Sequence, residues 1–267
     1  MTSEREPNRT ITPAPPPSTG WDSKTLTGNP HERTDKASRV REMFTSIAHS
    51  YDLNNRVHSL GLDQHWRRVA VQLAGPLAQA TVLDVACGTG DLTMAFVRGG
   101  ATTVIGLDYT PAMLDHARVK AARGRGRLAE IQYVQGDAHE LPYADHSFDV
   151  VSIAFGIRNV ADPLRAMREF RRVLAPGGRV IVLEFAEPPS AIVRFFHGLY
   201  TNHIMPFTAT LLARDRSGAY RYLPRSVETF LGPAQLSEQL ISAGFSKVTQ
   251  HPLTMGTCVI SVGFVAG

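Results

Sequence analysis

The chain has 267 residues, of which 43% are hydrophobic and 19% are charged, a balance typical of a soluble globular protein. Its net charge of +4 comes without a stripe of Lys and Arg interleaved with aromatic residues, which argues against nucleic acid as a partner. Two cysteines, Cys87 and Cys258, are too few for a disulfide framework and indicate a reducing compartment, the cytoplasm. We find no apolar run near the ~18 residues of a membrane span and no signal peptide, and we expect no metal site.

Residues 1–37 are expected to form a disordered, proline-rich tail. They contain the run Pro15–Pro17 and almost no apolar side chains. Such a segment cannot bury enough surface to offset the entropy that it would lose on ordering. The remaining residues, 38–267, are predicted to form one α/β domain.

Residues 38–80 precede the first predicted strand and carry two helical patterns. Apolar residues between Val40 and Tyr51 recur every three or four positions, and a second stripe runs from Trp66 to Leu73. A parallel sheet does not need these helices, so we interpret them as a cap that closes over a cofactor cleft. The side chains that such a cap would contribute are Tyr51, Asn54, Asn55 or His58. The alternative is a pair of surface helices packed on one face of the sheet.

The stretch from Thr81 to Asp108 has the pattern of a nucleoside-binding β–α–β unit. The apolar run Val82–Val85 predicts a buried strand, and Gly88 and Gly90 allow a sharp turn that brings the backbone close to a ligand. A helix is predicted directly after Gly90, and a second strand ends at Asp108. A carboxylate there can accept hydrogen bonds from both hydroxyls of a ribose. The alternative is a structural glycine turn without a ligand.

The residues after the turn favour S-adenosylmethionine over a dinucleotide. A dinucleotide fingerprint has a third glycine where this chain has Thr93, and Asp91 places an acid at the helix N-terminus. We expect Asp91 to repel a pyrophosphate and to compete for the same N–H groups. A cationic cofactor without phosphate avoids both conflicts.

The alternation of strands and helices continues towards the C-terminus. After the third strand, Asp137 either accepts a hydrogen bond from the exocyclic amine of adenine or caps a helix. The fourth strand, Phe148–Phe155, is followed by Arg158 and Asn159, and ligands bind at the carboxyl ends of such strands. A fifth strand over 179–185 and a C-terminal hairpin complete a doubly wound, seven-stranded sheet in which one strand is antiparallel.

Residues 186–222 interrupt this alternation with an apolar segment far longer than an ordinary connection. Its first helical stripe includes Ile192, Phe195, Phe196 and Leu199. So much apolar surface must pack on the edge of the sheet, line an apolar substrate pocket or rest on a membrane. These three alternatives do not exclude one another.

Several motifs resemble those of the quinone-precursor C-methyltransferases, the family of demethylmenaquinone methyltransferases and their demethylubiquinone-type relatives. The similarity spans about residues 44–263. The matching motifs are FxxIAxxYD (44–52), SLGLDQHW (59–66), VLDVACGTGD (82–91), SIAFGIRNV (152–160), RVLAPGGRVIVLEF (172–185) and YRYL (220–223). The glycine turn is shared by all methyltransferases of this fold, whereas FGIRN together with the Tyr-Asp block is much more specific.

The resemblance implies a Rossmann-like, S-adenosylmethionine-dependent methyltransferase that converts the prenylated quinol demethylmenaquinol to menaquinol. Carried over from the family, Thr89, Asp108, Asp137 and Ala138 would bind this cofactor, and from the β–α–β unit itself we add Asp84, Gly88 and Gly90. From their places in the predicted fold we assign catalysis to Arg158 and Asn159 and substrate binding to Tyr51, Asn55, Tyr200 and His203. A peripheral contact with the inner face of the cell membrane and a homodimer both stay open.

The chain departs from the family pattern at several positions. Asn54 stands where the family usually has Met, and Ala154 stands where a cofactor-contacting Ser appears. These departures leave room for a methyltransferase that acts on small phenolic natural products. A non-catalytic nucleoside-binding protein is a third alternative, but it would have no use for Arg158 and Asn159 beside a methyl site.

Arg158 is the residue to which we assign the main catalytic role. Methyl transfer to a ring carbon is helped by loss of a phenolic proton, and phenols titrate near ~10. Arg158 would stabilise the phenolate or hold a water that takes the proton, because an arginine itself stays protonated and is no base. The alternative is a structural salt bridge from Arg158 to Glu184 or Asp162.

Overall fold

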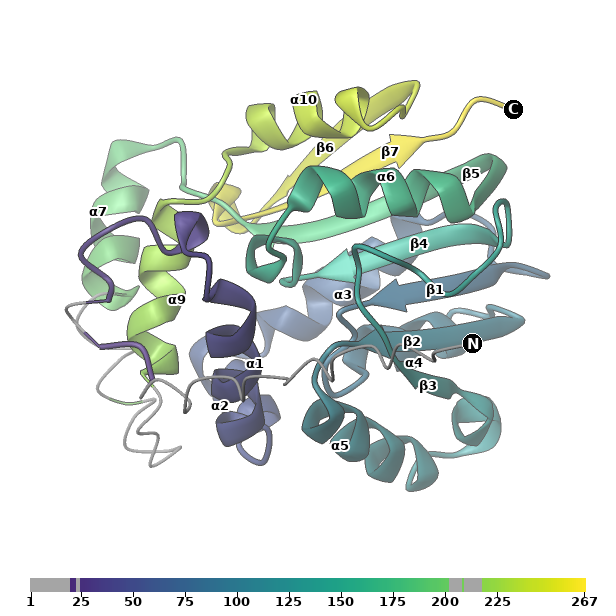
Figure 1. Cartoon of the computed structure of the whole chain (residues 1–267), viewed down its shortest axis with the longest axis horizontal. Coiled ribbons are helices and arrows are strands. Elements are labelled where there is room, and N and C mark those ends of the chain that lie inside the picture. The colour runs from purple at the N-terminus through teal and green to yellow at the C-terminus, as the bar shows by residue number, and fades with distance from the viewer. Residues whose placement is uncertain (1–19, 23–24, 202–207, 209–217) are drawn as a thin grey trace, which may run out of the picture.

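A seven-stranded sheet with the order β3-β2-β1-β4-β5-β7-β6 runs through the protein (Figure 1). The computed structural model describes residues 20–22, 25–201, 208 and 218–267. The strands are β1 (Thr81–Val85), β2 (Thr103–Asp108), β3 (Gln132–Gln135), β4 (Phe148–Ala154), β5 (Leu174–Phe185), β6 (Lys247–Leu253) and β7 (Cys258–Phe264). Strands β1 to β5 pair in parallel, and β7 is antiparallel to both β5 and β6. The predicted doubly wound sheet is therefore confirmed.

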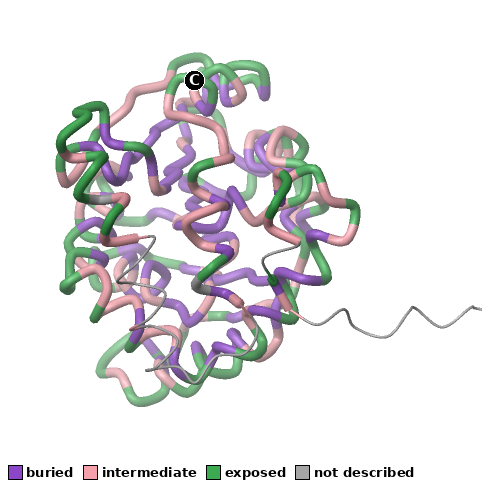
Figure 2. The backbone as a smooth tube through the Cα atoms, turned by 90° about the vertical axis from the view of Figure 1, so that its left-hand side faces the viewer, coloured by how far each residue is buried: buried purple, intermediate pink, exposed green. Residues whose placement is uncertain are grey.

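Helices cover both faces of this sheet because alternate strand residues are apolar on both sides. The helices are α1 (Lys36–Ile47), α2 (Tyr51–His58), α3 (Leu62–Leu73), α4 (Asp91–Arg98), α5 (Pro111–Ala122), α6 (Pro163–Val173), α7 (Ala191–Leu199), α9 (Ala219–Glu228) and α10 (Pro233–Ser242). Leu83 and Val151 share one core with residues of α6 and α10, and Val82 and Val150 share another with residues of α3 and α4. Figure 2 shows the buried stretches collected in the interior, as a sheet covered on both faces requires.

Helices α1, α2, α7 and α9 gather at one end of the sheet, on the left of Figure 1. The apolar side chains of α1, Val40, Met43 and Ile47, pack against Ala219 and Tyr222 of α9. Short 3-10 helices η1 (Pro30–Glu32), η2 (Gly126–Glu130), η3 (Ile157–Asn159) and η5 (Thr254–Gly256) complete the described chain. Within that part of the chain, we find no helix with the length and apolar character needed to cross a membrane.

The predicted cap, residues 38–80, differs from the structure in two respects. Its first helix ends at Ile47, and α2 begins anew at Tyr51. The apolar pattern continues across this break because the rings of Phe44 and Tyr51 contact each other, with 5.9 Å between their centroids. Helix α3 belongs to the layer that covers the sheet, since Trp66 is buried in a core that it shares with strand residues. The cap therefore consists of α1 and α2.

The prediction of disorder through residue 37 is wrong for the described part of that tail. Trp21 is only 2% exposed and stacks on the ring of Tyr222 with 4.5 Å between ring centroids. Asn29 caps η1 by accepting a hydrogen bond from the N–H of His31, and Lys36 begins α1. The proline-rich composition of the whole segment concealed this aromatic anchor.

Candidate functional site

Two adjoining cavities lie at the carboxyl ends of the strands. The smaller, of about 120 Å³, contacts the glycine turn and the end of β2, and the larger, of about 760 Å³, is enclosed by the cap, α7 and α9. Phe44, Tyr51 and Phe155 line both cavities. Ligands bound in the two cavities can therefore meet beside these three aromatic rings.

The two glycines of the turn have different tasks. Both have left-handed backbones, with φ +55° at Gly88 and +82° at Gly90. A Cβ on Gly88 would meet open space, and this residue lines the smaller cavity, so a ligand can approach the backbone directly. A Cβ on Gly90 would strike the hydroxyl of Tyr133. Gly88 therefore exposes the turn to a ligand, whereas Gly90 lets it pack against β3.

Asp108 is held in a fixed position at the end of β2. It is 8% exposed and lines the smaller cavity. Its Oδ1 accepts a hydrogen bond from the Thr110 N–H and its Oδ2 one from the Gly88 N–H, both at 2.8 Å. Burial raises the pKa of Asp108, and these two N–H donors oppose the rise. Since each oxygen keeps a further lone pair, the carboxylate can still accept hydrogen bonds from a ribose.

Two other predicted cofactor residues support the turn from behind. Asp84, which is 1% exposed, accepts hydrogen bonds from Thr93 Oγ1 at 2.6 Å and from Ser152 Oγ at 2.7 Å. Thr89 donates its hydroxyl to Asp52 Oδ1 at 2.5 Å. Their side-chain oxygens are engaged inside the protein and support the turn, and their contact with the cofactor stays a prediction. Sequence spacing located both residues but could not give the direction of their side chains.

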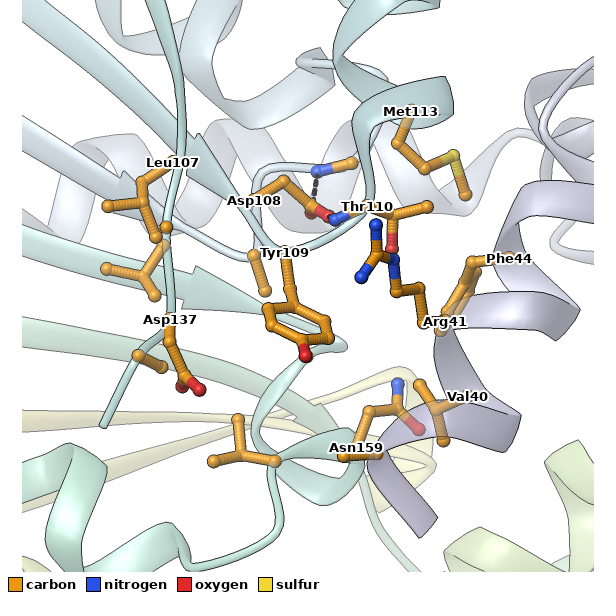
Figure 3. A pocket seen from close by; sticks show the side chains of 18 of the residues that line it. Val40, Arg41, Phe44, Leu107, Asp108, Tyr109, Thr110, Met113, Asp137 and Asn159 are labelled. Carbon is orange, nitrogen blue, oxygen red and sulfur yellow. Dashed lines mark hydrogen bonds between the residues drawn. The ribbon is translucent and has the colours of Figure 1, made fainter. Parts of the chain in front are cut away.

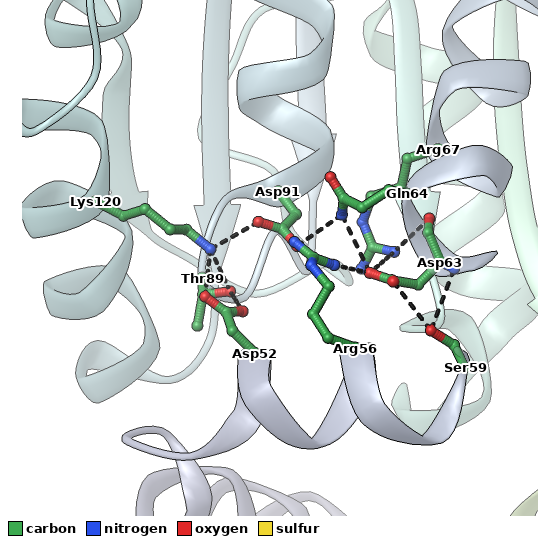
Figure 4. Close-up of polar contacts among 9 residues, drawn as sticks. All are labelled: Asp52, Arg56, Ser59, Asp63, Gln64, Arg67, Thr89, Asp91 and Lys120. Atoms are coloured by element: carbon green, nitrogen blue, oxygen red, sulfur yellow. Dashed lines mark hydrogen bonds and ion pairs between the residues drawn. The ribbon is translucent and has the colours of Figure 1, made fainter. Parts of the chain in front are cut away.

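Asp91 is paired with cations, which changes the argument about pyrophosphate. Lys120 Nζ lies 2.7 Å from Asp91 Oδ1 and 2.6 Å from Asp52 Oδ2, and Arg56 Nη2 lies 2.8 Å from Asp91 Oδ2 (Figure 4). Although burial raises it, the charges of Lys120, Arg67 and Arg56 lower the pKa of Asp91 to about 2. Because these cations balance the charge of Asp91, the expected repulsion of a pyrophosphate is not supported.

We call the contacts among Asp52, Arg56, Asp91 and Lys120 the polar latch. They connect α2 of the cap with the beginning of α4 and with α5. Beyond Arg56 the network continues into α3, and its further members are Ser59, Asp63, Gln64 and Arg67 (Figure 4). The latch thus ties the cap to the glycine turn by charge rather than by apolar packing.

Asp137 and Ala138 line the smaller cavity next to the end of β3. The chain forms turns after Asp137, so the alternative that this residue caps a helix is wrong. Asp137 Oδ1 instead accepts a hydrogen bond from the His139 N–H at 2.9 Å and lies 2.6 Å from His139 Nδ1. This holds a carboxylate whose side chain is half exposed at the cavity, and its contact with adenine stays a prediction.

Sequence reasoning missed Tyr109 and Arg41. The ring of Tyr109 extends across the smaller cavity between Asp108 and Asp137, and Arg41 of α1 lies over it, 5.3 Å from the ring centroid (Figure 3). A flat aromatic face suits a purine ring. Tyr109 could have been found because it directly follows Asp108, whereas Arg41 reaches the site from the cap and carries no local signal.

The larger cavity is mostly apolar and contains three of the four predicted substrate residues. Tyr51, Asn55 and Tyr200 line it. The Tyr200 hydroxyl donates to the backbone oxygen of His58 at 3.1 Å. The fourth residue, His203, lies outside the described residues. His58 also lines this cavity, as expected for the cap, whereas Asn54 is buried and donates to the Ser50 backbone oxygen.

Arg158 lines the larger cavity and also forms a salt bridge inside the protein. It is 5% exposed. Its Nη1 donates to Glu184 Oε1 at 2.5 Å and to the Phe155 backbone oxygen at 2.8 Å, so the salt bridge considered as an alternative exists, with Glu184 as its partner. The buried Nε has no hydrogen-bond partner among the described residues. The two contacts of Nη1 thus leave other N–H groups of the guanidinium unused by the described part of the chain.

Asn159 faces the smaller cavity, so the two predicted catalytic residues lie on either side of the junction. Its Nδ2 donates to the Phe155 backbone oxygen at 3.2 Å, and its Oδ1 accepts from the Tyr222 hydroxyl at 2.9 Å. The amide is thus held at both ends.

The groups around the smaller cavity fit S-adenosylmethionine. The buried Asp108 suits a ribose, and Gly88 presents no side chain to a ligand. The aromatic rings of Phe44, Tyr51 and Phe155 at the junction suit a cationic sulfonium, since the face of an aromatic ring attracts cations.

Solved structures share this fold. Two S-adenosylmethionine-dependent methyltransferases match with TM-scores of 0.59 and 0.54, the first from Thermotoga maritima and the second from Aquifex aeolicus. They are 20% and 16% identical to this chain and cover 84% and 74% of it, with 98% and 89% of their own chains. At these identities the likeness concerns the fold alone, and it agrees with the predicted Rossmann-like sheet.

Curated relatives are much closer in sequence. A demethylmenaquinone methyltransferase from Thermus thermophilus is 46% identical over 83% of this chain and 99% of its own length. Another from Deinococcus radiodurans is 42% identical over 87% of this chain and 95% of its own length. The ubiquinone/menaquinone biosynthesis C-methyltransferase UbiE from Idiomarina loihiensis is 39% identical, covering 87% and 92%. A family model described as the ubiE/COQ5 methyltransferase family matches residues 32–265. The cofactor of such methyltransferases is S-adenosylmethionine. From the family model and these identities, the chain belongs to the ubiE/COQ5 methyltransferase family.

Proposed function

We propose that this protein transfers a methyl group to a ring carbon of a prenylated quinol, converting demethylmenaquinol to menaquinol. Two relatives above 40% identity carry the name demethylmenaquinone methyltransferase. The apolar cavity of about 760 Å³ beside the cofactor cavity suits an apolar aromatic substrate. The single observation that carries the proposal is the position of Arg158, paired with the buried Glu184, in the wall of that cavity.

The proposed role of Arg158 is to stabilise the negative charge that the substrate develops. When bound, S-adenosylmethionine supplies an electrophilic methyl group. Loss of the phenolic proton places charge on the quinol oxygen and on the adjacent ring carbon, and a nearby guanidinium lowers the free energy of that anion. Arg158 stays protonated, so a water takes the proton. After methylation the ring carbon loses its hydrogen as a proton to water, which restores the aromatic ring, and the oxygen takes up a proton from water to give the quinol.

Glu184 makes a sharp test of this role possible. Replacing Arg158 by Met leaves the carboxylate of Glu184 buried and unpaired, which by itself destabilises a protein. The double variant R158M/E184Q removes that charge and should recover stability. We expect R158M to lower kcat by a factor of about 10²–10³, the usual effect of losing such a donor. The dissociation constant for S-adenosylmethionine, measured by calorimetry, should change less than about twofold, because Arg158 lines the other cavity.

The assay incubates the protein with reduced demethylmenaquinol and follows the methylated product by mass spectrometry. In the double variant we expect recovered thermal stability without recovered turnover. Recovered turnover would make Arg158 a structural residue only. A wild-type protein that methylates small phenols but no prenylated quinol would favour a natural-product methyltransferase instead.

We also propose that α7 and its neighbours rest on a membrane surface, from which a prenylated substrate can enter. Exposed apolar side chains border the mouth of the larger cavity: Leu60 at 87% exposure, Ile192 at 72%, Phe196 at 63% and Met255 at 72%. Phe195 and Leu199 extend this apolar surface along α7. Such a patch at the mouth of an apolar cavity is typical of a lipid-binding surface.

A further inference from the structure

The segment around Trp21 lies outside the residues that match the family, which begin at residue 32, yet it is part of the core beside the larger cavity. Trp21 stacks on Tyr222 with 26° between the ring planes. Tyr222 is 1% exposed and lines the larger cavity. Trp21 therefore forms a second layer behind one wall of the proposed substrate site.

Three contacts hold Trp21 in this place. Arg39 Nη1 donates to the Gly20 backbone oxygen at 3.0 Å, and the Arg39 guanidinium lies 5.8 Å from the Trp21 ring centroid. The backbone of Trp21 also passes so close to Gly218 that any Cβ there would collide with the Trp21 carbonyl. The position of Trp21 thus depends on α1 and on the residue that precedes α9.

Tyr222 contacts the turn between β4 and α6, which carries Arg158 and Asn159. Its hydroxyl donates to Asn159 Oδ1 at 2.9 Å, and Asn159 Nδ2 donates to the Phe155 backbone oxygen. The same Phe155 oxygen accepts a hydrogen bond from Arg158. A further hydrogen bond holds this turn from α1: the buried Lys36 Nζ donates to the Val160 backbone oxygen at 2.6 Å.

We propose that Trp21 and Tyr222 are positioning residues for methyl transfer, which orient the Asn159 amide and hold the turn that carries Arg158. This inference rests on the proposed function for its effect on turnover. A neutral hydrogen bond to Asn159 fixes which end of the amide faces Tyr222. Without that bond the amide can rotate, and the turn between β4 and α6 loses a contact to α9. The Trp21 ring in turn keeps Tyr222 from tilting into the larger cavity.

The variants Y222F, W21A and W21F separate positioning from mere packing. Y222F removes only the hydroxyl, W21A removes the supporting ring, and W21F keeps an aromatic ring. We expect kcat to fall about tenfold in Y222F and in W21A, the effect of losing one neutral hydrogen bond. W21F should retain at least about half of the wild-type kcat. The double variant W21A/Y222F should be no worse than the poorer single variant, because both changes act through Asn159.

A matched control is Y143F. Tyr143 packs on Phe148 and its hydroxyl has no partner among the described residues, so this variant should keep wild-type turnover. The calorimetric dissociation constant for S-adenosylmethionine should stay within about twofold in W21F and Y143F, and it is also measured in Y222F and W21A because Asn159 lines the smaller cavity. Wild-type kcat in Y222F would overturn the inference, and so would equal losses in W21A and W21F.

Amide hydrogen exchange tests the same inference without any substrate. The Asn159 N–H donates to the Gly156 oxygen and the Val160 N–H to the Ile157 oxygen. Exchange of these amides should become about tenfold faster in Y222F and W21A but not in Y143F. Unchanged exchange in Y222F and W21A would refute the positioning role. If the wild type methylates no quinol while exchange responds as expected, the proposed function fails and the positioning of this turn stands.

Discussion

The two cavities are built on different principles. About half of the residues that line the smaller one come from a single stretch, 85–139, and most of its polar groups are fixed by hydrogen bonds within the protein, as for Asp108. The larger one draws on the cap, α7, α9 and the β6–β7 hairpin, is mostly apolar, and is lined by the guanidinium of Arg158, which is paired with Glu184. A small polar cofactor needs prearranged partners, whereas a large apolar substrate needs space and an entrance.

Among variants that alter only one of the two cavities, we expect the largest effect on binding from D108N in the smaller cavity. The change keeps the shape of the side chain but removes the charge of the carboxylate that accepts hydrogen bonds from Gly88 and Thr110 and that we predict to bind the ribose. We expect the dissociation constant for S-adenosylmethionine to rise about 100-fold, because hydrogen bonds to charged groups each contribute about 1.5–3 kcal/mol. Calorimetry measures this directly.

The matched control is D115N, which alters an exposed aspartate of α5. The KM for the quinol should stay within about twofold of the wild-type value in both variants. A quinol KM that rises as steeply as the cofactor dissociation constant in D108N would mean that the two cavities do not act separately.

The same contrast explains how much the sequence could predict. Asp108, Gly88 and the strands around them lie close together in the chain, so spacing alone located them. The direction of Thr89 and the cation partners of Asp91 depend on α2 and α5, and local patterns carry no information about such contacts. Trp21 is one apolar residue in a proline-rich segment, and its partner Tyr222 is 201 positions away.

A second prediction concerns the apolar surface on the substrate side. In F195Q/L199Q, two exposed side chains of α7 that do not line the larger cavity become polar. If these side chains enter a bilayer, binding to neutral phospholipid vesicles should weaken at least about tenfold, since burial of one such side chain contributes about 1.5–3 kcal/mol. Vesicle flotation measures the bound fraction.

The control for this experiment is I241Q, which changes a half-exposed side chain of α10 on another face. Turnover of a quinol without a tail should be unaffected in F195Q/L199Q, while turnover of the prenylated quinol in vesicles should fall. Equal loss of vesicle binding in both variants would show that α7 has no special role at the membrane.

The smallest effect should come from the polar latch, because its charges are partly exposed and part of their attraction is screened by solvent. K120M removes the contacts of Lys120 with Asp52, Asp91 and Thr89, so the cap is held less firmly over the cofactor. We expect the dissociation constant for S-adenosylmethionine to rise about fivefold, which corresponds to about 1 kcal/mol. Calorimetry at low and high salt should show that the difference between the wild type and K120M shrinks as salt increases.

Acid unfolding gives an independent view of the same latch. The pKa of Asp91, about 2 in the folded protein, lies below the unfolded value of ~3.9. Asp91 therefore contributes stability that is fully present above about pH 4 and is lost as the pH falls through about 2. Without Lys120 this pKa should rise, and unfolding should begin at a higher pH. In K247M, a lysine at the far edge of the sheet is changed, and neither property should move. If K120M and K247M behave alike, the cap is held by the apolar contacts of α1 with α9, and the charges of the latch contribute only to its solvation.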